Sequence, residues 1–150
     1  MKKTLAALIL ASVAGSVLAQ QTLKPEEMIK TRKAAYSFMA WNMGKIKANL
    51  DGSFNQDQVV HAANAVAAVA NSGLGALFGP GTDKEVGGEK TRVKPEFFQQ
   101  QDKVREVAMN FNKEANELAK VAATGDKAAI QAQFGKTGAT CKACHDSFRN

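Results

Sequence analysis

The five residues Cys141-Lys142-Ala143-Cys144-His145, close to the carboxyl end of this 150-residue chain, constrain its fold more than any other feature. Cys141 and Cys144 are the only cysteines, and His145 follows them directly. On a helix, positions i, i+3 and i+4 share one face. Both thiols can then form thioethers to one edge of a porphyrin while the His145 imidazole lies under the iron, and the spacing is that of covalent haem c attachment. We therefore expect the chain to fold around one iron-containing haem c.

Two other uses of such a cysteine pair need a context that the sequence does not provide. A thioredoxin-like redox pair is expected after a strand in a βαβ unit, and a zinc site needs about two further ligands nearby. The only other histidine is His61, and there is no third cysteine. A redox dithiol is the alternative to haem attachment.

The amino-terminal stretch differs from the rest of the chain. Lys2 and Lys3 precede an apolar run over residues 5–18 that ends in small residues. This is the pattern of a secretory signal peptide, and the run is shorter than the roughly 20 residues that a membrane span needs. We expect a signal peptide over residues 1–19 and a mature domain over residues 20–150 that works in the bacterial periplasm and has no membrane span. An uncleaved anchor is the alternative.

The balance of charge argues against a nucleic-acid partner. The formal net charge of the whole chain is +6, and two of these charges belong to Lys2 and Lys3 of the predicted signal peptide. The remaining basic residues are scattered among acidic ones, unlike the basic stripe of a nucleic-acid-binding domain. A mildly basic surface suits an acidic partner protein instead.

Four segments repeat apolar residues at steps of three and four, which predicts helices. A proline or a capping residue marks the start of each segment, and a glycine or a turn marks the end of the first three. The predicted helices cover residues 25–51, 55–73, 95–124 and 127–148. No segment alternates with the period of a strand, so we predict an all-α fold, an antiparallel four-helix bundle with the covalently attached haem in its core.

The one long connection covers residues 73–94. It contains six glycines and Pro80 and shows no sustained period, which predicts irregular surface structure. Connections of this length within a compact domain are usually functional. We expect part of this one to cover an edge of the cofactor.

Several features together resemble the cytochrome c′ family of class II c-type cytochromes. They are the predicted signal peptide, Arg32 early in the first helix, Phe78-Gly79-Pro80-Gly81-Thr82 in the long connection, Lys94-Pro95-Glu96 at the start of the third helix, and the haem motif near the carboxyl end. The resemblance covers essentially the whole predicted mature chain. Only five residues follow His145, so we expect no ligand methionine downstream of the motif, unlike in class I cytochromes.

The resemblance implies that His145 is the axial iron ligand from the protein and that the haem is high-spin and five-coordinate. It also implies that the residue four places after the arginine covers the distal face, and here that residue is Tyr36. Low-spin relatives are expected to carry methionine there, and a tyrosine phenol with its high pKa is a poor ligand at neutral pH. Met39 is the first alternative as a sixth ligand. Four further side chains can bind iron in principle but are expected in the core or on the surface, namely Met28, Met43, Met109 and His61.

Four side chains are candidates to contact the edge of the haem. The Arg32 guanidinium can pair with a haem propionate, as the resemblance also implies. Lys33 and Thr91 are weaker propionate candidates. Arg149 lies four residues after His145 and is predicted beside the proximal imidazole. The alternative for the charged residues is a solvated helix face.

We predict a haem protein that binds NO and CO and acts as a nitric oxide sink or carrier, not an enzyme. The alternative is an electron-transfer protein that passes one electron through the haem iron to or from a periplasmic redox partner. A peroxidase would need a distal His or Arg acid–base pair, where the first helix offers Tyr36 and Met39. The resemblance also implies a homodimer through the first two helices, for which the alanine-rich second helix and the region of Trp41, Met43 and Ile46 offer a surface.

Overall fold

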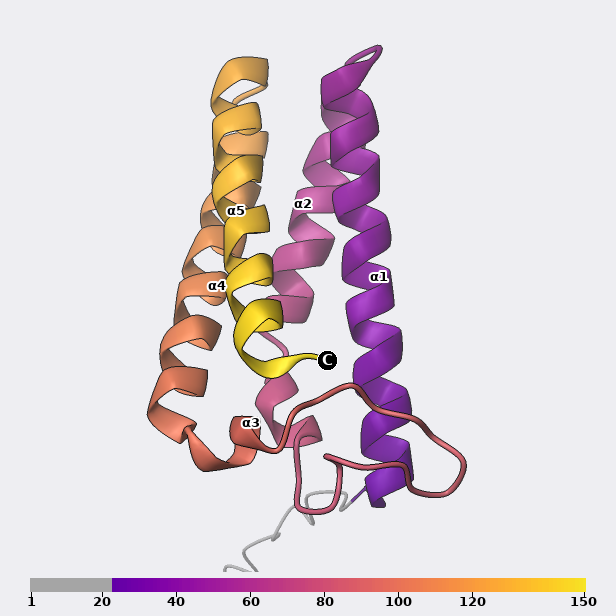
Figure 1. The fold of residues 1–150 in the computed structure, drawn as a ribbon. Helices are drawn as coiled ribbons and strands as arrows, with labels where there is room; N and C mark the ends of the chain where they lie inside the picture. The colour runs from indigo at the N-terminus through magenta and orange to yellow at the C-terminus, as the bar shows by residue number, and fades with distance from the viewer. Residues whose placement is uncertain (1–22) are drawn as a thin grey trace, which may run out of the picture.

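The computed structural model describes residues 23–150, and the predicted signal peptide at residues 1–19 lies outside them. Four long helices form an elongated bundle (Figure 1), which confirms the predicted all-α fold. They are α1 (Pro25–Asp51), α2 (Gln56–Ala70), α4 (Gln101–Ala122) and α5 (Lys127–Phe148). Two short elements lie between α2 and α4, the 3-10 helix η1 (Leu74–Leu77) and α3 (Glu96–Gln99). Within residues 23–150, no helix is long and apolar enough to cross a membrane.

Side-chain caps begin the helices where the sequence predicts them. The Asn55 side chain accepts a hydrogen bond from the Gln58 amide at 2.9 Å, which starts α2. Asp126 Oδ1 accepts from the amides of Ala128 and Ala129 at 2.9 and 3.1 Å, which starts α5. These bonds satisfy N–H groups that the first turn of a helix leaves without a partner. The start of the haem-motif helix is therefore fixed by its own sequence.

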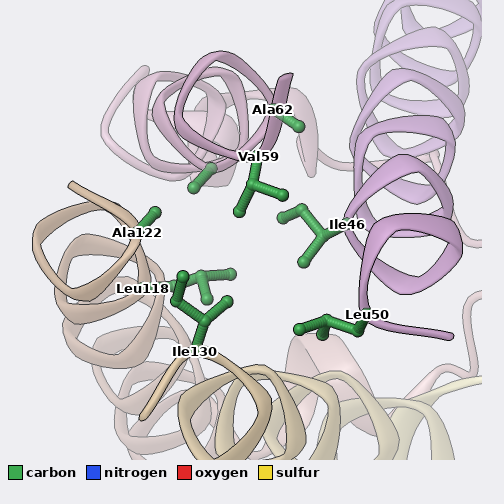
Figure 2. Close-up of a cluster of buried hydrophobic side chains, with 8 residues drawn as sticks. Ile46, Leu50, Val59, Ala62, Leu118, Ala122 and Ile130 are labelled. Carbon is green, nitrogen blue, oxygen red and sulfur yellow. The ribbon is translucent and has the colours of Figure 1, made fainter. Parts of the chain in front are cut away.

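The hydrophobic core fills one end of the bundle. Its side chains come from all four long helices and point toward one another (Figure 2). The cluster contains Ile46, Leu50, Val59, Ala62, Ala63, Leu118, Ala122 and Ile130. These residues lie in the second half of α1, the first half of α2, the second half of α4 and the start of α5, so they occupy the end that is distant from the Cys-x-x-Cys-His motif. The cluster of buried apolar side chains thus lies at one end, and the other end can hold a site.

The helices do not pack evenly around the bundle. The pairs α1–α2, α2–α4 and α4–α5 pack closely, whereas α1 and α5 make few contacts with each other. In an ordinary four-helix bundle each helix packs on two neighbours around a shared core. The weak α1–α5 interface leaves room between the first helix and the haem-motif helix.

Residues 78–94 connect η1 to α3, and we call this segment the strap. In Figure 1 it crosses the amino-terminal half of α1. Its tip is a turn at Gly87 and Gly88, both with positive φ, closed by reciprocal hydrogen bonds between Val86 and Glu89. Positive φ at both central residues is the requirement of a type I′ turn, which glycine meets without strain. The predicted irregular connection is confirmed, apart from the single 3-10 turn at its start.

The structure divides the third predicted helix into two helices. It breaks at Gln100, whose φ of −110° and ψ of 56° are not helical, into α3 and α4. Phe97 of α3 stacks on Phe78 with ring centroids 4.4 Å apart and meets Phe148 at 5.5 Å. Neither glycine nor proline occurs at the break, so no local signal predicts it. The packing of aromatic rings from three separate segments accounts for it.

The predicted dimer surface needs one correction. Ile46 is 0% exposed and belongs to the core, so it cannot contact a second copy of the chain. Trp41 is 59% exposed on the outer side of α1. The two side chains point in different directions, because residues five positions apart lie on different faces of a helix.

Candidate functional site

A cavity of about 720 Å³ lies between α1 and α5, at the end of the bundle away from the core. Its volume is within the range of roughly 300–1,000 Å³ that is typical of ligand and cofactor pockets. The middle of α1, from Arg32 to Met43, forms one side and the last three turns of α5 form another. Val66 of α2, Phe111 of α4, and Phe78, Thr91 and Phe97 complete the wall.

The end of α5 presents all three residues of the Cys-x-x-Cys-His motif to this cavity. Cys141, Cys144 and His145 line it, and the two cysteines are half-buried free thiols. Burial raises the pKa of both thiols above the ordinary value. Reactive dithiols in redox proteins have a lowered pKa instead. The two cysteines also lie on a helix of an all-α bundle and not in a βαβ unit, which is unlike a thioredoxin-like redox dithiol. Within residues 23–150 no group of three His, Cys, Asp or Glu side chains is placed to hold a metal ion.

Arg149 lies beside the His145 ring, where the sequence predicts it. Its Nη1 is 3.3 Å from Nδ1 and 3.4 Å from Nε2 of His145. Two backbone hydrogen bonds hold this end of the chain against the strap, from the Lys94 amide to the Phe148 carbonyl and from the Asn150 amide to the Arg92 carbonyl, each 2.9 Å long. The position of Arg149 is thus fixed by the backbone on both sides of it.

Arg32 is a buried cation in the wall of the cavity. Its residue is 3% exposed, and burial lowers the pKa of the guanidinium below the usual value. Within residues 23–150 no carboxylate lies within 4 Å of it. A buried charge is costly unless it is hydrogen-bonded and paired. The wall therefore favours a cofactor that brings an anionic group to this side.

Tyr36 lines the cavity from α1, one helical turn after Arg32, and the residue is 41% exposed at the cavity mouth. Its ring meets Phe78 edge to face at 6.4 Å between centroids. The pKa of the phenol is raised to about 12, first by burial and then by the negative charge that a Cys144 thiolate would carry. The free phenol is therefore neutral at physiological pH.

The candidate sixth ligands separate clearly in the structure. Met39 is 6% exposed and Met43 is partly buried, and both line the cavity. His61 and Met109 are exposed, and neither of them lines the cavity; nor does Met28, which packs against the strap at Gly79.

Lys33 and Thr91 both reach the cavity, but each already has a protein partner. The Lys33 ammonium pairs with the Glu89 carboxylate at 2.8 Å. Thr91 Oγ1 accepts a hydrogen bond from Arg32 Nη2 at 2.7 Å. Their role toward a haem propionate stays a prediction.

Sequence reasoning missed several residues of this region, and three of them are the most informative. Phe97 and Phe111 line the cavity, and Thr82 is fully buried against Arg32. Phe111 belongs to the predicted apolar stripe of its helix, and Thr82 ends the Phe-Gly-Pro-Gly-Thr segment of the long connection. No sequence pattern indicated that Phe97 would line the cavity, because its position depends on the break at Gln100.

The residues of this cavity fit a covalently bound haem. Two thiols and an imidazole share one helix end, the lining is largely apolar and aromatic, and a buried guanidinium without a carboxylate partner is available for an anionic group. Thioether formation needs free thiols, and a porphyrin needs apolar walls together with a cation for its propionates.

Comparisons with known proteins agree with this assignment. The family model described as Cytochrome C' matches residues 27–149. The chain is 57% identical to cytochrome c' of Allochromatium vinosum over 146 residues, which is 97% of this chain and 94% of the relative. It superposes on the crystal structure of cytochrome c' from Thermochromatium tepidum with a TM-score of 0.83 and 59% identity, covering 85% of this chain and 98% of the other.

Further solved structures of cytochromes c' carry information on ligands and assembly. One, 61% identical with a TM-score of 0.84 over 85% of this chain and 97% of its own, is described as having an unusual ligand-controlled dimer dissociation. Cytochrome c prime from Alcaligenes xylosoxidans, 28–29% identical, has been solved as a nitric oxide complex of one variant and a carbon monoxide complex of another. The match over nearly all of the described residues, at this identity, shows that the chain belongs to the cytochrome c′ family, whose cofactor is haem c.

Proposed function

We propose that Cys141 and Cys144 hold one haem c as thioethers and that His145 is the only iron ligand from the protein. The observation that carries this proposal is the position of all three residues on the α5 wall of one cavity, with Tyr36 as a neutral phenol on the α1 wall. A c-type haem supplies an iron that binds small gases such as NO and CO when the protein leaves one axial position free.

The α1 wall controls access in this proposal. Tyr36 is the distal lid, because its ring is held at the cavity by Phe78 and its phenol does not ionise at neutral pH. Arg32 carries the buried positive charge that faces a propionate. On the α5 side, Arg149 stands against the His145 ring and stabilises its orientation.

The function that these residues support best is binding of NO and CO, with the protein acting as a nitric oxide sink or carrier rather than an enzyme. Support comes from the NO and CO complexes of the Alcaligenes xylosoxidans relative. Titration of the reduced, haem-loaded protein with NO and with CO, followed by its absorption spectrum, tests the proposal. We expect saturable uptake of both gases. No uptake by the wild-type protein would contradict it.

A matched pair of variants tests the lid. Tyr36→Ala removes a ring that lines the cavity, whereas Met109→Ala removes a side chain that is 66% exposed on α4 and does not line it. We expect Tyr36→Ala to speed CO association about tenfold, the effect of relieving roughly 1.4 kcal/mol of crowding. Met109→Ala should leave the rate unchanged. Equal rates in both variants and the wild type would exclude Tyr36 as the lid.

Electron transfer with a periplasmic redox partner is the second candidate, and the position of Met39 is what favours it. This side chain is nearly fully buried and lines the cavity three residues after Tyr36. If its sulfur binds the iron, Met39→Leu will convert a low-spin spectrum into a high-spin one. We expect instead that the wild-type spectrum is already high-spin and that Met39→Leu leaves it unaltered.

We also propose a homodimer in the periplasm. Phe38 and Trp41 are exposed next to each other on α1, with ring centroids 5.8 Å apart, and Lys45 lies over the Trp41 ring at 3.8 Å. Large exposed aromatic rings gathered on one helix are typical of a protein interface. The relative with ligand-controlled dimer dissociation supports a link between ligand binding and assembly.

Sedimentation of the haem-loaded protein with and without CO tests this assembly. We expect a dimer that dissociates when CO binds, and Trp41→Lys should give a monomer under both conditions. Met109→Lys, at a side chain 66% exposed on α4, is the control and should behave as the wild type. A monomeric wild-type protein would contradict the dimer, and a dimer unchanged by CO would contradict the link.

A further inference from the structure

Arg32 donates most of its hydrogen bonds to residues in and next to the strap. Nη1 donates to the Leu77 carbonyl at 3.0 Å and to Thr82 Oγ1 at 2.8 Å. Nη2 donates to the Thr82 carbonyl at 2.5 Å and to Thr91 Oγ1 at 2.7 Å. A guanidinium has five N–H donors, so four are used and only Nε–H is free of a partner within residues 23–150.

Thr82 is the centre of this arrangement. It is 0% exposed, and its hydroxyl accepts from Arg32 while its own proton goes to the Gly79 carbonyl at 2.8 Å. Its carbonyl accepts a second bond from the same guanidinium. The Phe78 ring covers the group, with the Arg32 Cζ 4.5 Å from the ring centroid. Shielding from water strengthens charge-assisted hydrogen bonds.

The strap also fits closely against α1 on both sides of this point. A Cβ on Gly79 would lie 2.9 Å from Met28 Sδ, and a Cβ on Gly87 would lie 2.9 Å from Glu26 Cβ. The Lys33–Glu89 ion pair adds an exposed contact, with side chains 54% and 29% accessible. Exposed pairs of this kind contribute little to stability. The buried bonds of Arg32 therefore dominate the attachment.

We propose that Thr82 is a positioning residue, which with Arg32 forms a buried clasp that fixes the strap as a wall of the haem cavity. The clasp holds the guanidinium in one orientation, so Arg32 offers a carboxylate in the cavity Nε–H alone. A propionate that took an Nη donor would have to displace Thr82 or Thr91, and the strap would loosen. Thr82 thus fixes both the position of the strap on α1 and the orientation of the Arg32 guanidinium toward the cavity.

The test compares three variants of the haem-loaded protein with the wild type by hydrogen exchange. Thr82→Val keeps the shape but removes the hydroxyl, Thr82→Ser keeps the hydroxyl, and Glu89→Gln removes only the exposed ion pair. The reporters are the amides of Val86 and residue 89, which bond each other at the strap tip, and the Leu118 amide in the core is the reference. We expect exchange at the tip to become about ten- to a hundredfold faster in Thr82→Val, the effect of losing a hydrogen bond to a charged group. Thr82→Ser should restore slow exchange, and Glu89→Gln should change it less than about threefold.

The midpoint potential of the haem provides a readout that a purely structural role would not move. A positive charge held in the cavity wall favours the reduced iron. Thr82→Val keeps the charge of Arg32 but frees the guanidinium to move away from the cavity, so this variant should lower the potential, and Thr82→Ser should restore it. If Thr82→Val fails to fold, Thr91→Val removes one bond to the same guanidinium and should give the same changes at smaller size. Wild-type exchange and potential in the valine variant, or equal acceleration by Glu89→Gln, would overturn the proposal.

Discussion

Replacing Leu118 by alanine should destabilise the bundle strongly and leave the haem site intact. Leu118 is 0% exposed and lies in the cluster at the end of the bundle away from the cavity. Leucine-to-alanine changes in cores cost about 2–5 kcal/mol, and the cost is high where neighbours cannot move in to fill the space. Three of the neighbours in the cluster, Ala62, Ala63 and Ala122, are already small. We expect a loss of about 3–5 kcal/mol in the free energy of unfolding.

Urea unfolding followed by circular dichroism measures this loss, and the melting temperature should fall by roughly 10 °C or more. Met109→Ala is the control, because a side chain 66% exposed should change stability by less than about 0.5 kcal/mol. The haem absorption spectrum of Leu118→Ala should match the wild type at low temperature. A loss below about 1 kcal/mol, or an altered spectrum, would refute the division of the bundle into a stabilising end and a binding end.

Two further predictions concern the strap and the lid. Gly87→Ala should destabilise the protein more than Gly88→Ala in thermal unfolding. Both positions have positive φ, which costs about 1–2 kcal/mol for alanine, but only at Gly87 would the new Cβ meet Glu26. Equal losses of stability in the two variants would contradict the close fit of the strap. Tyr36 is the only tyrosine in the chain, so alkaline ultraviolet difference spectroscopy reports its ionisation alone. Because its pKa is raised from 10.0 to about 12 in the folded protein, the unfolded chain loses this proton first, so the contribution of Tyr36 to stability should be constant below pH 10 and fall between pH 10 and 12. A spectroscopic transition near pH 10 would contradict the raised pKa.

The sequence predicted those parts of the molecule that depend on local signals. Helix limits followed from Pro25, Asn55, Asp126 and the glycine-rich connection, because caps and turns act over a few residues. The positions of Cys141 and His145 on one wall followed from helical spacing alone.

The parts that the sequence did not predict depend on contacts between distant segments. The break at Gln100 arises with the packing of Phe97 on Phe78 and Phe148, which no local pattern encodes. Burial of Ile46 depends on the rotation of α1 about its axis, and the apolar stripe defines that rotation only broadly. The bonds of Arg32 to Thr82 and Thr91 join residues 50 and 59 positions apart, so the spacing of residues on one helix could indicate the cation but not its partners.

The spin state of the purified haem protein tests the central claim most directly. Electron paramagnetic resonance of the ferric form and absorption spectra of the ferric and ferrous forms, recorded without added ligand, report how many protein groups bind the iron. We expect high-spin, five-coordinate iron in both oxidation states, with His145 as its only protein ligand beneath a free position covered by Tyr36. Low-spin, six-coordinate iron in both states would mean that a second side chain, with Met39 the first candidate, completes the coordination, and it would contradict the gas-binding function.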